Sequence, residues 1–142
     1  MKKYLLIIIF LFTLFLSSCG ILPITKNSDL NGTVWTLTNY NGTALLSNTT
    51  MTAFFESGEV NGSAGCNHYF GSFKAKSDQI QIDGLGWTEM ACMDPEGIMQ
   101  QEQQVMSLLS EAATFSIQGQ VLQIITGSGE VMEFQQIVNL EY

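Results

Sequence analysis

The sequence predicts an α+β protein: a small antiparallel β-barrel, or a strongly curled sheet, with one amphipathic helix packed on it. Two observations carry this prediction. After residue 30, short segments of alternating apolar and polar residues are separated by turn signals, most clearly Asn41-Gly42 and Ser57-Gly58. A single stretch that follows Asp94 instead repeats its apolar residues at helical spacing. A lone helix among antiparallel strands usually covers an open end or one face of the sheet.

Residues 1–18 have the pattern of a secretory signal peptide. Lys2 and Lys3 precede an apolar run from Tyr4 to Leu16 that only Thr13 interrupts. As a helix this run would span roughly 20 Å, which is short of the roughly 30 Å hydrocarbon core of a bilayer. A basic start, a short apolar centre and small residues before a cleavage site are typical of a secretory signal.

The segment Leu16-Ser17-Ser18-Cys19 resembles a bacterial lipobox, in which the cysteine receives the lipid. We therefore expect a lipoprotein that is anchored through Cys19, because each buried lipid methylene contributes ~0.8 kcal/mol. The alternative is an ordinary signal peptide that is cut near Ser18. Gly20 resembles the outer-membrane sorting signal of Gram-negative lipoproteins, so the expected location is the cell envelope, at the outer membrane and facing the periplasm.

Residues 19–29 contain Pro23 and show no periodicity, which indicates a lipidated tether ahead of a domain over residues 30–142. Alternation and turn signals in that domain predict a series of short strands. The expected strands cover residues 32–37, 50–55, 59–63, 70–75, 79–82, 114–117, 121–126 and 131–137.

The segment Asp94-Pro95-Glu96 predicts the start of the helix, because it supplies an N-cap, a proline at the first helical position and an acid in the first turn. Apolar residues then form one broad face of the expected helix: Ile98, Val105, Met106, Leu109, Ala112 and Ala113.

The charge of the chain argues against nucleic acid as a partner. After removal of residues 1–18, three lysines and thirteen acidic residues remain, a formal charge of −10. Such a surface repels phosphate backbones and gains nothing from anionic lipid headgroups. Attachment to a membrane would therefore depend on the acyl chains.

Two cysteines remain if Cys19 carries lipid: Cys66 and Cys92. In an oxidising compartment such a pair usually forms a disulfide. A bridge between them would stabilise the fold by roughly 3 to 4 kcal/mol on the chain-entropy estimate. Spacing alone does not establish the geometry that a disulfide needs.

Separated motifs in the domain resemble one family. They are Gly65-Cys66-Asn67 with Tyr69 and Gly71 after it, Met90-Ala91-Cys92, Glu102 and, near the domain start, Trp35-Thr36-Leu37. Together they are similar to the META domain of HslJ-type heat-shock lipoproteins, over residues 30 to 138. The family often has arginine after the first motif and before the second, where this chain has His68 and Glu89.

The resemblance implies a small β-barrel with a helix, and a structural role for the motif residues. With the cysteine count, it leads us to expect a disulfide between Cys66 and Cys92. It also implies a general link to envelope stress, without an established enzymatic activity.

Other uses of the same residues are possible. In an extended chain, Cys66 and His68 would share one face and could form a nucleophile with its base. Methionines 90, 93 and 99 could join them and Cys92 around Cu(I), although methionine is also a common core filler. We favour a structural corner, with neither a catalytic nor a metal site. A small barrel could also carry a small hydrophobic ligand, but an interior filled by side chains is favoured.

The function expected from the sequence is therefore that of a membrane-anchored, non-enzymatic binding or envelope-stress accessory protein. It would need no cofactor. Its expected partners are the membrane, through lipid on Cys19, and an envelope protein or a small hydrophobic ligand.

Overall fold

Tight turns define the order of the strands in the computed structural model, which describes residues 29–137. Asn41, Gly42, Ser57 and Gly58 all have positive φ. Two consecutive residues of this kind match the twist of a two-residue hairpin, as both sequence signals predicted.

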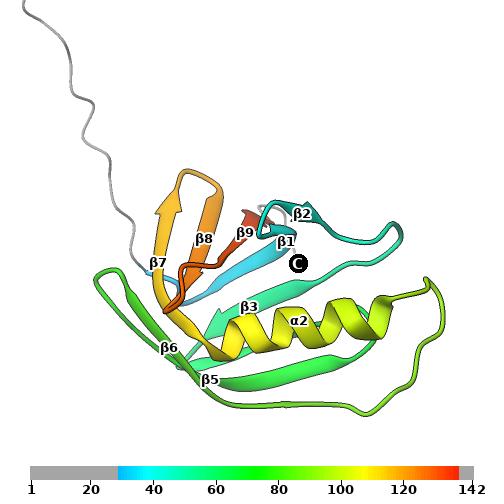
Figure 1. Ribbon diagram of the computed structural model, residues 1–142. Coiled ribbons are helices and arrows are strands. Elements are labelled where there is room, and N and C mark those ends of the chain that lie inside the picture. Colours follow the sequence, from blue (N-terminus) through cyan, green and yellow to red (C-terminus); the bar gives the residue numbers. More distant parts are fainter. Residues whose placement is uncertain (1–28, 138–142) are drawn as a thin grey trace, which may run out of the picture.

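The strands form an antiparallel barrel with one helix, which confirms the expected α+β class (Figure 1). In chain order the elements are β1 (Thr33–Tyr40), β2 (Thr43–Ala44), β3 (Thr52–Glu56), β4 (Glu59–Ser63), β5 (His68–Lys76), β6 (Gln79–Trp87), α2 (Ile98–Ser110), β7 (Ala112–Gln118), β8 (Val121–Thr126) and β9 (Val131–Gln136). Neighbouring strands pair in the order β1-β3-β4-β5-β6-β7-β8-β9, and β9 pairs with β1 to close the barrel. The short β2 also pairs with β1, beyond β3.

Side chains fill the interior of the barrel. The first strand turns Trp35 and Leu37 inward, and the core includes the fully buried residues Phe55, Leu122 and Met132. This arrangement agrees with the favoured expectation of a filled interior. A bound molecule would therefore have to lie outside the barrel.

Of the neighbouring strands in the barrel, β6 and β7 have the fewest paired residues. These strands share a single paired position, Gln79 with Thr114, whereas β5 and β6 are paired from Lys76–Gln79 to Tyr69–Trp87. The chain between β6 and β7 forms α2, which lies across this side of the barrel (Figure 1). Val105, Met106 and Leu109 bury the apolar face of the helix against the core.

The predicted boundaries of the helix are wrong at both ends. It begins at Ile98, not at Asp94, because Gly97 immediately before it has φ +89°, which interrupts a right-handed helix. It ends at Ser110, because Ala112 already pairs with Thr126 as part of β7.

The strand expected over residues 79–82 continues to Trp87. Its second half contains Gly84 and Gly86, which weaken the sequence signal for a strand. A register shift opposite Phe70 and Ser72 accommodates this segment.

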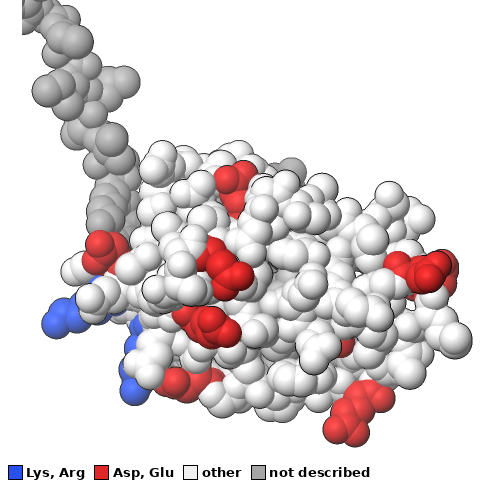
Figure 2. Space-filling model, viewed as in Figure 1, with Lys and Arg blue, Asp and Glu red and all other residues white. Residues whose placement is uncertain are grey.

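Acidic side chains are spread over the face that carries α2, and lysines gather at one corner (Figure 2). Within the described residues the only lysines are Lys74 and Lys76, at the end of β5, and there is no arginine. The same part of the chain contains no helix that is long and apolar enough to cross a membrane. Cys19 and the expected signal and tether lie outside the described residues.

Candidate functional site

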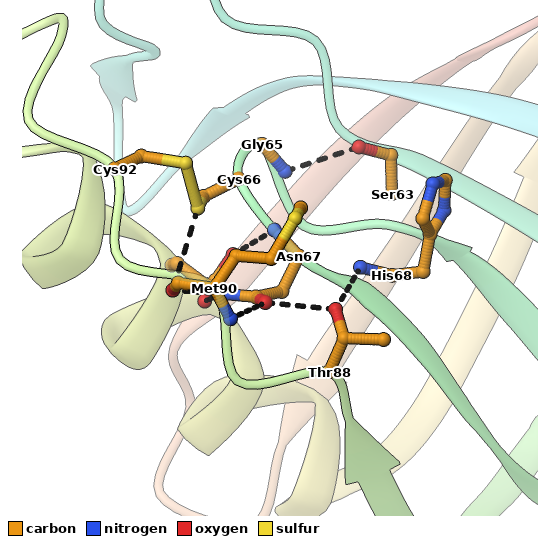
Figure 3. The surroundings of a disulfide bond; sticks show 9 residues. Ser63, Gly65, Cys66, Asn67, His68, Thr88, Met90 and Cys92 are labelled. Carbon is orange, nitrogen blue, oxygen red and sulfur yellow. Dashed lines mark hydrogen bonds between the residues drawn. A yellow bond between two sulfur atoms is a disulfide. The ribbon is translucent and has the colours of Figure 1, made fainter.

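The first motif forms a corner between β4 and β5. Gly65 has φ +108°, a conformation that favours glycine, and so the chain turns sharply before the cysteine. Cys66 forms a disulfide with Cys92, with a distance of 5.9 Å between the Cα atoms (Figure 3). The bridge ties the corner to the segment that leads into α2.

The side chain of Asn67 is the centre of this corner. Its Oδ1 accepts hydrogen bonds from the backbone N–H of Met90 (2.7 Å) and the hydroxyl of Thr88 (2.8 Å). Its Nδ2 donates to the carbonyl oxygen of Met90 (3.2 Å) and to Oε1 of Glu102 (2.7 Å). All of these partners lie more than twenty residues away from Asn67 in the sequence.

Glu102 links the corner to the helix. Its Oε2 accepts a second hydrogen bond from the backbone N–H of Asn67 (2.7 Å), so both carboxyl oxygens face one residue. Glu102 is 4% exposed and Asn67 is 1% exposed. Hydrogen bonds to a charged group in such a setting are strong, and the loss of one partner leaves a buried polar atom unsatisfied.

The remaining motif residues support the same corner. The hydroxyl of Tyr69 donates to the carbonyl oxygen of Thr52 (2.9 Å), and burial raises the pKa of this phenol above its ordinary range. Gly71 lies under Leu85 of β6, where an added Cβ would approach Cδ2 of Leu85 to 3.0 Å. Met90 and Ala91 lie on the exposed connection after β6.

The structure does not bring Cys66 and His68 together as a catalytic pair. The Cys66 thiol is consumed by the disulfide, and Cys66 precedes β5, so the two residues do not alternate along one extended strand. The ring of His68 is exposed and points away from the disulfide (Figure 3). The backbone of His68 joins the corner through Thr88: its N–H donates to the Thr88 hydroxyl (3.2 Å), and its carbonyl oxygen accepts from the Thr88 N–H (3.0 Å).

The residues considered for copper are also not arranged as a site. The disulfide removes both thiolates, and Met93 is 91% exposed. Within residues 29–137 no group of three or more His, Cys, Asp or Glu residues could hold a metal ion.

A pocket lies outside the barrel, between α2 and β6. We call it the α2–β6 groove. Gly84, Leu85 and Trp87 line one wall, residues of α2 from Met99 to Ser110 line the other, and the volume is about 780 Å³. Glu102 contributes to the helix wall, so the corner positions the helix that forms the groove.

Sequence reasoning missed this groove. The only signal was the segment Asp83-Gly84-Leu85-Gly86-Trp87, in which large apolar residues alternate with glycines near the end of a strand. Phe70 of β5 is 61% exposed and lies against Gly86 on the outer face of the sheet.

Comparisons with known proteins agree with this fold. The family model of the META domain matches residues 28–139. An NMR structure of a protein from Burkholderia xenovorans is similar, with 25% identity, a TM-score of 0.67, and coverage of 78% of this chain and 85% of that chain. A crystal structure of a DUF4847 family protein from Bacteroides vulgatus ATCC 8482 is similar in fold, with 12% identity, a TM-score of 0.54, and coverage of 75% and 93%. No curated protein matches the chain.

Proposed function

This chain belongs to the META domain family, and from that premise we propose that it is a lipid-anchored, non-enzymatic binding protein of the cell envelope. Cys19 carries the lipid, residues 19–29 are the tether, and the barrel faces the periplasm from the outer membrane. The signal-like start and the lipobox-like segment support the anchor.

The observation that carries the binding role is the α2–β6 groove. Its walls expose apolar surface from Leu85, Trp87 and Met99, and Trp87 and Met99 are 49% and 37% exposed. Large apolar side chains that gather in a concavity are typical of binding sites. Because side chains fill the barrel, a small hydrophobic ligand would bind in this outer groove and not in the interior, and an envelope protein would use the same surface.

The positions of Cys66 and His68 also support a role in binding. The disulfide holds the sulfur atom of Cys66, and His68 faces solvent beside it without forming a pair. The corner that contains both residues supports α2 and thereby shapes one wall of the groove.

Photocrosslinking in intact cells tests this proposal. A benzophenone amino acid replaces Gln103, which lines the groove, or its neighbour Gln104, which faces away toward Tyr40. We expect a distinct covalent adduct from position 103 that position 104 does not form. The groove is not the binding surface if the probe at position 103 forms no adduct, or if it forms only the adducts that the probe at position 104 also forms.

A further inference from the structure

We propose that the α2–β6 groove binds an extended segment of a basic, apolar polypeptide, which adds as a strand to the outer edge of β6. This inference rests on the proposed function, because it takes the groove to be the binding surface. It adds the chemistry of the ligand and its mode of binding.

The outer edge of β6 is open for most of its length. On one side β6 pairs with β5 as far as Trp87. On the other side β7 pairs with it only at Gln79, and no described strand follows the edge from Ile80 to Trp87. An unpaired edge presents backbone N–H and C=O groups to an added strand. The helix opposite this edge supplies the second wall of a channel for that strand.

The dimensions of the groove suit a short extended segment. The helix wall runs from Met99 to Ser110, a length of about 16 Å at 1.5 Å per residue. A strand that rises about 3.4 Å per residue fills this length with about five residues. Gly84 has φ +64° and lies at the register shift between β5 and β6, so β6 bulges within the groove wall. Glycine in a strand marks such a bulge or the close approach of another backbone, and an added Cβ at Gly84 would meet no heavy atom within 4 Å.

The walls indicate which side chains the segment would carry. Leu85, Trp87 and Met99 present apolar surface, and methionine adapts its shape to different partners. Because alternate side chains of a strand point to opposite faces, every second residue of the ligand would contact these walls. The ligand therefore has apolar residues at alternate positions.

Charge complementarity indicates that the other positions are basic. Asp83 and Glu89 are exposed and flank the β6 wall in the sequence; neither lines the groove itself, and Asp83 lines a neighbouring concavity against β4 and β5. The described residues contain two lysines and twelve acidic residues, and both lysines, Lys74 and Lys76, lie on β5 opposite Gln81 and Gln79, in the first part of β6 and away from the groove wall. Such a surface attracts Lys or Arg side chains and repels acidic ones.

The test uses a seven-residue peptide of alternating Lys and Leu, capped at both ends and labelled with a fluorophore. Binding to the full chain in nanodiscs of neutral phosphatidylcholine is measured by fluorescence anisotropy, with empty nanodiscs as the blank. Gln103→Trp fills the groove, and Gln104→Trp is the matched control on the other side of α2. We expect Gln103→Trp to weaken binding at least tenfold and Gln104→Trp to change it less than twofold.

Backbone methylation tests the addition of a strand. One peptide is N-methylated at the Leu residues and a second at the Lys residues. In a strand these two sets of N–H groups point to opposite edges, so only one set can donate to β6. We expect the two methylated peptides to differ at least tenfold in affinity, and a Glu-Leu peptide to bind at least tenfold more weakly than the Lys-Leu peptide.

Equal affinity of the two methylated peptides would overturn strand addition while leaving the groove as the binding surface. Equal binding of the Glu-Leu peptide would overturn the basic ligand. No binding of the Lys-Leu peptide, or no effect of Gln103→Trp, would overturn the inference as a whole. The crosslinking experiment is independent of peptide chemistry, so failure of the inference is distinguishable from failure of the proposed function.

Discussion

The contact between Asn67 and Glu102 predicts an unusual response to an almost isosteric change. In wild type, both carboxyl oxygens of Glu102 accept hydrogen bonds from donors on Asn67, each at 2.7 Å. Glu102→Gln replaces one of these oxygens with an NH₂ group, which then faces another donor. The change removes a hydrogen bond to a charged group and leaves a buried donor without an acceptor.

Each of these two losses costs between about 1 and 3 kcal/mol, so Glu102→Gln should lower the free energy of unfolding by about 2 to 6 kcal/mol. At about 4 °C per kcal/mol for a domain of this size, the melting temperature should fall by about 8 to 24 °C. The matched control is Glu111→Gln, at the exposed C-cap of the same helix, which should stay within about 0.5 kcal/mol of wild type.

A double-mutant cycle tests the pairing itself. Asn67→Asp alone places a second carboxylate against Glu102 and should be more destabilising than Glu102→Gln. In the double variant, the new amide NH₂ can donate to the new carboxylate, and the amide oxygen can still accept from the backbone N–H of residue 67. We expect a favourable coupling energy of about 1 to 3 kcal/mol from urea denaturation. A coupling energy below about 0.5 kcal/mol, or a stable Glu102→Gln variant, would refute the described contact.

Three further outcomes are expected. Cys66→Ser combined with Cys92→Ser should lower the free energy of unfolding by about 2 to 5 kcal/mol. Thiol counting on denatured, unreduced wild-type protein should find neither Cys66 nor Cys92 free. Alkylation of both cysteines would contradict the disulfide. Burial raises the pKa of the Tyr69 phenol from its usual 10.0, so just above pH 10 the unfolded chain loses this proton and the folded chain keeps it. The free energy of unfolding should therefore fall there by up to about 1.4 kcal/mol per pH unit. Tyr69→Phe should remove this contribution to the dependence of unfolding free energy on pH. If wild type and Tyr69→Phe lose stability equally per pH unit above pH 10, the phenol of Tyr69 is not buried. Cys19→Ala should abolish incorporation of radioactive palmitate, and equal labelling of variant and wild type would end the lipid-anchor proposal.

The sequence predicted those parts of the fold that local rules determine. Asn41-Gly42 and Ser57-Gly58 form turns because both residues of each pair adopt positive φ, which is a local property. Alternation predicted a strand over residues 32–37, and the structure buries Trp35 and Leu37 on one face of it, because the inward face of a strand repeats every two residues.

Features set by tertiary contacts were not predictable in the same way. Asp94-Pro95 has the composition of a helix start, but Gly97, with φ +89°, delays the helix to Ile98. Asn67 was recognised as a motif residue, but its partner Glu102 lies 35 positions away. The groove depends on where β6 and β7 separate, which no short segment of sequence encodes.

Closure of the barrel by β1 and β9 has a consequence for the timing of folding. Leu37 pairs with Phe134, so the first and last described strands meet across almost the whole domain. Bringing together positions about 100 residues apart costs roughly 4 kcal/mol of loop entropy, and this contact cannot form until β9 has emerged. In a chain that is synthesised from its N-terminus, the barrel therefore cannot close before β9 is available. The cooperative native state forms only after the last strand has been made.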